Sequence, residues 1–167
     1  MRGVDTVFDT FMGLPVHVLI VHAVVVLVPL AAIGAVIMAL RPHFSRRFGV
    51  LVIAVGIVGL IAAFIARQSG EQLASRVGYP DPHTELGSVL PAIVGVFVAI
   101  LIVFWLFDRG VPGNRARPIW LKVMAVLVVI AAVASLWWTI RVGHSGSEAT
   151  WGAVIENTEP GRITPPS

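Results

Sequence analysis

Near the start of the chain lies a stretch of more than twenty residues without a charged side chain. It runs from Gly13 to Leu40 and contains no Asp, Glu, Lys or Arg. A helix rising about 1.5 Å per residue needs about 20 residues to cross a hydrocarbon core of about 30 Å. The stretch therefore predicts a transmembrane helix and makes the whole chain an expected integral membrane protein.

The composition agrees with a membrane protein. Of the 167 residues, 57% are hydrophobic and 13% are charged, whereas a soluble domain carries about 25% charged residues. This length accommodates four spans, and we expect no separate soluble catalytic domain. The chain has no cysteine, which excludes disulfides, thiolate metal sites and Cys-ligated iron–sulfur clusters. With a net charge of only +3 and basic residues in short loops, we expect no nucleic-acid partner.

Four apolar segments predict an all-α, antiparallel four-helix bundle in the lipid bilayer. Residues 1–13 carry apolar side chains at helical spacing and predict a short amphipathic helix at the membrane interface. The bundle is expected over residues 14–155, followed by a flexible, proline-containing tail over residues 156–167. The expected spans cover about 14–40, 48–76, 83–107 and 118–142.

The distribution of charge predicts an orientation. Residues 41–47 and 108–122 hold seven of the twelve Lys and Arg residues but one of the nine acidic residues. Basic loops stay on the cytoplasmic side. We therefore expect an inner (cytoplasmic) membrane protein with loops 41–47 and 108–118 in the cytoplasm and both termini outside.

Four histidines lie near the expected extracytoplasmic ends of the spans. His17, His83, His144 and also Glu71 each lie 23 or 24 residues from the cytoplasmic edge of their own helix, so the bundle brings them to one level. His22 lies about 7–8 Å deeper on the first helix. A histidine in an apolar membrane segment costs free energy unless it finds a partner, so these are candidate functional residues.

Imidazoles from facing helices can bind a haem iron or a metal ion. His17 or His22 on the first helix and His83 on the diagonally opposite third helix predict a b-type haem, with His22 as the better candidate for a buried axial ligand. The alternative is a single zinc or copper ion, bound by three histidines with Glu71 or Glu148. A third possibility is a structural or assembly subunit without a cofactor, in which the histidines satisfy one another.

Further polar residues near this level would surround such a site: Glu71, Glu85, Glu148, Arg67 and Arg141. Arg67 and Arg141 can pair with haem propionates, or with Glu71 and Glu148 instead. Gly87, Gly143 and Gly146 would let a planar macrocycle approach the backbone. The chain has no Ser-His-Asp spacing, no glycine-rich phosphate loop and no HExxH motif, so at most an electron-transfer subunit is expected rather than a hydrolase.

A short internal echo links the two halves of the chain. Gln68-Ser69-Gly70-Glu71 after the second span resembles His144-Ser145-Gly146-Ser147-Glu148 after the fourth. His17 heads the first span much as His83 heads the third. Two helical hairpins related by duplication would explain both similarities.

Three stretches resemble a known family. They are residues 13–22 (GLPVHVLIVH), His83 with Leu86-Gly87, and residues 143–146 (GHSG). Over residues 13–155 the chain is similar to the bacterial four-span membrane proteins of domain-of-unknown-function family 2231. It departs from them at Val18, where the family usually has proline, and at residues 147–151, where the family usually continues with glycine and a Leu-Val-Tyr run.

The resemblance implies a four-span membrane protein without a settled activity. Some family members are fused to Rieske-type iron–sulfur domains, which implies work near a membrane redox chain. This association favours haem b and electron transfer, with a redox partner on the extracytoplasmic side, over a bare metal ion.

Overall fold

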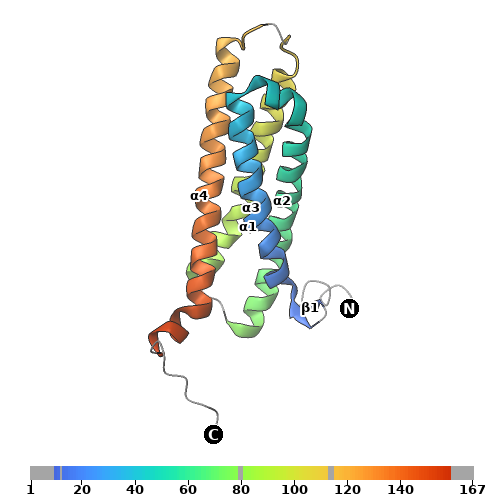
Figure 1. The fold of residues 1–167 in the computed structure, drawn as a ribbon. Coiled ribbons are helices and arrows are strands. Elements are labelled where there is room, and N and C mark those ends of the chain that lie inside the picture. The colour runs from blue at the N-terminus through green and yellow to red at the C-terminus, as the bar shows by residue number, and fades with distance from the viewer. Residues whose placement is uncertain (1–9, 12, 79–80, 113–114, 159–167) are drawn as a thin grey trace.

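Four long helices make up most of the chain (Figure 1). The computed structural model describes residues 10–11, 13–78, 81–112 and 115–158. Two short antiparallel strands precede the helices. The elements are β1 (Thr10–Phe11), β2 (Leu14–Pro15), α1 (Val16–Leu40), α2 (Pro42–Val77), α3 (Asp81–Asp108) and α4 (Ile119–Glu156).

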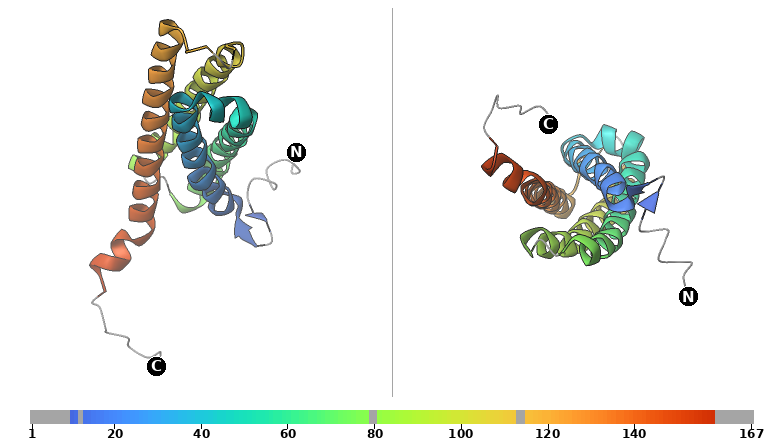
Figure 2. Two further views of the ribbon diagram at one scale, coloured as in Figure 1. Left: turned by 45° about the horizontal axis from the view of Figure 1, so that its top comes forward. Right: turned by 90° about the horizontal axis from the view of Figure 1, so that it is seen from below.

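The helices form a closed antiparallel ring. α1 and α3 each pack against both α2 and α4, so α1 and α3 lie across a diagonal of the bundle (Figure 2). Successive helices run in opposite directions, and only Arg41 separates α1 from α2. The predicted all-α four-helix bundle is confirmed.

The outer surface of the bundle is apolar. All four helices are long and apolar enough to cross a membrane. Large aliphatic side chains such as Val26, Ile33 and Ile130 are more than half exposed. Such a surface suits hydrocarbon, because lipid tails are as apolar as leucine side chains. The chain is therefore a membrane protein with four candidate spans.

Small residues bring the helix backbones close together. A Cβ atom added at Gly34 of α1 would lie 2.9 Å from the methyl groups of Val52 on α2. A Cβ atom added at Gly59 of α2 would lie 3.3 Å from a methyl group of Val28 on α1. Close packing of this kind is a main source of attraction between helices in a membrane. Larger residues at these glycines would push α1 and α2 apart.

Several boundaries differ from those expected. α2 begins at Pro42, so residues 42–47 form its first turns rather than a loop; proline suits this position because its fixed φ is already helical. α4 continues to Glu156 instead of ending near residue 142. The amphipathic helix expected over residues 1–13 is wrong at Thr10–Phe11, which pair with Leu14–Pro15 as strands. Residues 1–9 and 12, and residues 159–167 of the expected tail, lie outside the described residues.

A buried ion pair closes the end of the bundle at which α1 and α3 end. Arg117 donates from Nε and Nη2 to the two carboxylate oxygens of Asp108, at 2.7 and 2.8 Å. The two side chains are 7% and 0% exposed. Arg117 also donates to the carbonyl oxygens of Met38, at 2.9 Å, and Ala39, in the last turn of α1, where carbonyls lack intrahelical partners. The pair therefore joins the α3–α4 connection to the ends of both α1 and α3.

The two ends of the bundle differ in their side chains. The arginine end contains Arg41, the ion pair and the α3–α4 connection. The histidine end is the opposite one, at which α1 and α3 begin and α2 ends.

Candidate functional site

Two imidazoles meet at the histidine end. His17 lies in the first turn of α1 and His83 in the first turn of α3. Their ring centres are 6.1 Å apart, and the rings meet edge to face at an interplanar angle of 75°. Because α1 and α3 lie on a diagonal of the bundle, the two rings approach each other across its interior.

His17 is held by the neighbouring helix α2. Its Nδ1 atom lies 2.9 Å from the carbonyl oxygen of Ala66. The ring also covers Gly70, one turn further along α2, where an added Cβ atom would lie 3.0 Å from the ring's Cε1 atom. The absence of a side chain at Gly70 therefore provides the space that the imidazole occupies.

His83 is held by α4 in the same way. Its Nδ1 atom lies 3.2 Å from the carbonyl oxygen of Val142 and 3.2 Å from the hydroxyl oxygen of Ser145. A Cβ atom added at Gly146 would lie 3.0 Å from the Cε1 atom of the ring. Thus each imidazole packs on a glycine and reaches the carbonyl four residues before that glycine.

The serines that precede these glycines also occupy matching positions. Ser69 donates a hydrogen bond to the carbonyl of Ala66 at 3.2 Å, and Ser145 donates to that of Val142 at 3.0 Å. The short sequence echo around Ser69-Gly70 and Ser145-Gly146 therefore corresponds to two equivalent histidine environments.

These hydrogen bonds indicate the tautomer of each neutral ring. A carbonyl oxygen only accepts, so the contact with Ala66 assigns the hydrogen of His17 to Nδ1. The contact with the Val142 carbonyl favours the same tautomer for His83, while the Ser145 hydroxyl can act as donor or acceptor. The lone pair of each ring is then on Nε2, the atom left for a ligand. Metal-binding histidines typically have this arrangement, with one nitrogen held by a backbone carbonyl and the other on the metal.

His22 does not join this pair. Its side chain is exposed on the outside of α1, and its Nδ1 atom lies 2.6 Å from the carbonyl oxygen of Val18 in the same helix. Five residues correspond to about 140° around a helix, so a residue this far from His17 faces another direction. His22 is therefore exposed where a buried position was expected, and its role as an axial ligand stays a prediction.

His144 also points away from the pair. It is 80% exposed, and its Nδ1 atom lies 3.9 Å from a carboxylate oxygen of Glu148, one turn further along α4. It precedes Gly146 by two residues, or about 200° around the helix. Because Gly146 faces His83, His144 faces the outside.

Two of the five expected surrounding residues pair with each other, and the other three lie apart from them. Arg67 donates to Glu71 at 3.1 Å, and both are exposed. Arg141 lies over the ring of Trp137, with its Cζ atom 5.1 Å from the ring centre. Glu85 is exposed on α3. Within the described parts of the chain, no group of three or more His, Cys, Asp or Glu side chains is arranged to hold a metal ion, so the expected cluster of three histidines and a glutamate is not assembled.

Sequence reasoning missed the groups that orient the two rings. The backbone carbonyls of Ala66 and Val142 have no sequence signal, since every residue has a carbonyl. The repeated Ser-Gly pairs were the available signal, but their link to histidines on other helices depends on the packing. The sequence also did not predict that the indole of Trp138 on α4 donates a hydrogen bond to the carbonyl of Leu86 on α3, at 2.9 Å.

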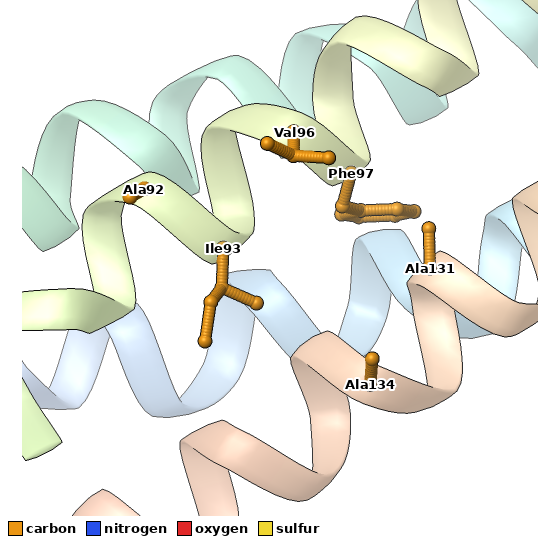
Figure 3. Close-up of a pocket in the computed structure, with 6 residues that line it drawn as sticks. All are labelled: Ala92, Ile93, Val96, Phe97, Ala131 and Ala134. Atoms are coloured by element: carbon orange, nitrogen blue, oxygen red, sulfur yellow. The ribbon is translucent and has the colours of Figure 1, made fainter.

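An apolar groove lies away from the histidine pair, between α3 and α4 (Figure 3). It has a volume of about 280 Å³ and is open at the surface. Its lining presents no side-chain donor or charge, so it suits hydrocarbon rather than a polar substrate. The lining residues are Ala92, Ile93, Val96, Phe97, Ala131 and Ala134.

Comparison with known proteins identifies a family. Neither the curated proteins nor the solved structures include a match to this chain. A family model described as "Predicted membrane protein (DUF2231)" matches residues 13–159. The matched region contains all four helices and both members of the histidine pair. The chain therefore belongs to this family of predicted membrane proteins.

Proposed function

We propose that the protein binds b-type haem between His17 and His83 and acts as an electron-transfer subunit of the membrane. The observation that carries this proposal is the approach of two imidazoles from diagonal helices, with ring centres 6.1 Å apart. Both rings are held at Nδ1 by backbone carbonyls, which leaves Nε2 as the ligating atom.

The separation of the rings suits a shared metal centre. Two metal–imidazole bonds of about 2.0–2.1 Å, added to roughly 1 Å from each nitrogen to its ring centre, separate the ring centres by about 6 Å. The observed separation of 6.1 Å is close to this value, which applies when both Nε2 atoms face the metal from opposite sides. From the edge-to-face arrangement, one ring would turn to bring its Nε2 atom toward the metal.

The number of donors favours haem over bare zinc. Zinc takes three or four protein ligands, and the described residues hold no group of three or more suitable side chains. Haem iron needs only the two axial ligands from the protein, because the porphyrin supplies the other four nitrogens. The pair of His17 and His83 matches that requirement.

Other residues at this end support a bound macrocycle. A Cβ atom added at Gly87 or Gly143 would meet nothing within 4 Å, so the backbone is open there. Arg67 and Arg141 are exposed at the same end and can pair with propionates. Bound haem would supply one-electron transfer, while the protein orients the axial imidazoles.

The proposal includes a location and a partner. Arg41, Arg46 and Arg47 lie at the arginine end with the basic α3–α4 connection, and the positive-inside rule assigns this end to the cytoplasm. The histidine pair then lies on the extracytoplasmic side of the cytoplasmic membrane. A redox partner would exchange electrons with the site from that side.

An absorption spectrum of the purified protein tests the proposal. Protein expressed with a haem precursor is expected to show a Soret band, and the His17→Ala and His83→Ala variants are expected to lose it. Exogenous imidazole should restore part of the band in His83→Ala, because the truncation leaves space beside Gly146. A wild-type protein that stays colourless after haem supplementation would contradict the proposal.

His22→Ala and His144→Ala are the matched controls. Both rings are exposed, and among the described residues each has its polar contact within its own helix, so their removal should leave the Soret band unchanged. Loss of haem in either control would mean that the ligands are not His17 and His83.

A copper ion held by the same two imidazoles is the second candidate, because the ring separation suits any single metal between two nitrogens. Elemental analysis distinguishes copper from haem. Copper that is present without a Soret band, and that is lost in His83→Ala, supports the copper ion.

A purely structural role for the two histidines rests on the existing hydrogen bonds of both rings. It predicts that the wild-type protein holds neither haem nor metal and that His17→Ala only lowers stability.

A further inference from the structure

The arginine end carries a set of exposed cations without a neighbouring anion. The one acidic residue of this end in the described ranges is Asp108, which is 0% exposed and already paired with Arg117. That pairing leaves six exposed basic side chains uncompensated by the protein. They are Arg41, Arg46, Arg47, Arg109, Arg115 and Lys122.

Two of these cations lie over aromatic rings. The Cζ atom of Arg47 is 5.4 Å from the ring centre of Phe48, and that of Arg109 is 4.8 Å from the ring centre of Trp105. Aromatic rings are enriched at the membrane–water interface. The guanidinium groups of Arg47 and Arg109 are therefore placed beside side chains of the kind found at the membrane–water interface.

Further aromatic residues mark the same level. Phe107 and Trp120 meet edge to face with ring centres 5.4 Å apart. They are 52% and 47% exposed, and they come from the last turn of α3 and the first turn of α4. Exposed aromatic residues and uncompensated cations thus share one end of the bundle.

The histidine end has a different charge arrangement. There, Arg67 pairs with Glu71 at 3.1 Å, and His144 lies 3.9 Å from Glu148. Arg67 at that end thus has an anion of the same chain beside it, and Arg141 lies over the ring of Trp137. At the arginine end, the described residues provide no anion for the six exposed cations, so any counter-charge comes from another molecule.

We propose that the arginine end is a binding surface for the headgroups of anionic phospholipids. Guanidinium groups donate paired hydrogen bonds to phosphate oxygens. Basic residues close to a membrane surface are attracted to anionic lipids, and the attraction decays within a Debye length. This surface lies at the opposite end of the bundle from the histidine pair, so the proposal does not depend on haem.

Native mass spectrometry of the full-length protein tests the proposal. Delipidated protein in a neutral detergent is mixed with equal amounts of phosphatidylglycerol and phosphatidylcholine. We expect more bound phosphatidylglycerol, with a preference that falls as salt is raised. The variant with Arg46→Gln, Arg47→Gln and Arg109→Gln should lose the preference, by about fivefold for each cation removed.

Two variants control for effects on the fold. Arg67→Gln with Arg141→Gln removes the same type of charge from the histidine end and should keep the preference. Replacing Arg46, Arg47 and Arg109 by lysine keeps the charge and should retain most of it. Circular dichroism checks that all variants remain helical.

Three results would overturn the proposal. The first is equal binding of the two lipids by the wild-type protein. The second is an equal loss of preference in the variant with Arg67→Gln and Arg141→Gln. The third is displacement of phosphatidylglycerol by the same concentration of inorganic phosphate. The last result would make the surface a site for free phosphate.

Discussion

At the scale of single residues, two glycines determine where the imidazoles lie. His17 and His83 occupy the space beside Gly70 and Gly146 that a Cβ atom would take. None of the described glycines has His22 or His144 as its nearest neighbour, and both histidines are exposed. The two candidate ligands therefore lie where a glycine on the neighbouring helix leaves space for an imidazole ring.

Gly146→Ala is expected to destabilise the protein by up to about 2 kcal/mol. Overpacking costs about 1–3 kcal/mol, and replacing a helical glycine by alanine recovers up to about 1 kcal/mol. The new Cβ atom would lie 3.0 Å from His83 and would displace its ring. The free energy of unfolding in mixed micelles measures the effect.

Gly143→Ala is the matched control, three residues earlier in α4. A Cβ atom there meets nothing within 4 Å, so the variant should gain about 0.5–1 kcal/mol from the helix preference of alanine. Equal effects of the two substitutions would contradict the role given to ring packing at Gly146.

At the scale of elements, the helix ends are joined by the Arg117–Asp108 pair. Helix α1 ends at Leu40 and α2 begins two residues later, so the last carbonyls of α1 have little neighbouring chain to pair with. Arg117 comes from the connection between the two other helices and supplies the missing donors. One side chain thus joins three elements.

Arg117→Met is expected to cost about 3–5 kcal/mol, because it leaves the buried carboxylate of Asp108 without a partner. Adding Asp108→Leu should recover a large part of that loss, since no buried charge then remains. A double-mutant cycle of unfolding free energies measures the coupling. Strictly additive effects of the two substitutions would mean that the ion pair does not couple them.

At the scale of the whole molecule, the bundle consists of two similar hairpins. In each of them, the first helix supplies a histidine and the second supplies the Ser-Gly pair and the carbonyl that hold it. Neither hairpin contains both imidazoles. The candidate site therefore exists only when the hairpins are packed together.

The orientation of the bundle can be tested because the chain has no cysteine. Single cysteines at two exposed positions, Ala116→Cys and Thr150→Cys, report the arginine end and the histidine end. In intact cells, a membrane-impermeant maleimide should label Thr150→Cys and should label Ala116→Cys only after lysis. The reverse pattern would contradict the proposed orientation.

Much of the fold could be predicted from the sequence. The long apolar segments indicated four helices, and their short connections indicated an antiparallel order. Two boundaries could not be read this way, because Pro42 begins α2 inside an expected loop and α4 extends through polar residues to Glu156. Helical hydrogen bonding continues into polar sequence, so a change in hydropathy does not mark the end of a helix.

The sequence by itself determined the level of the site along the bundle. His17 and His83 lie at similar numbers of residues from the far ends of α1 and α3, and the rise per residue converts that count into depth. Only the tertiary structure decided which histidines meet. The direction of a side chain around its helix depends on which face packs against the neighbours, and that choice is made by contacts such as Gly70 with His17 and Gly146 with His83. Depth is a property of one helix, whereas a shared site is a property of the packing of all four.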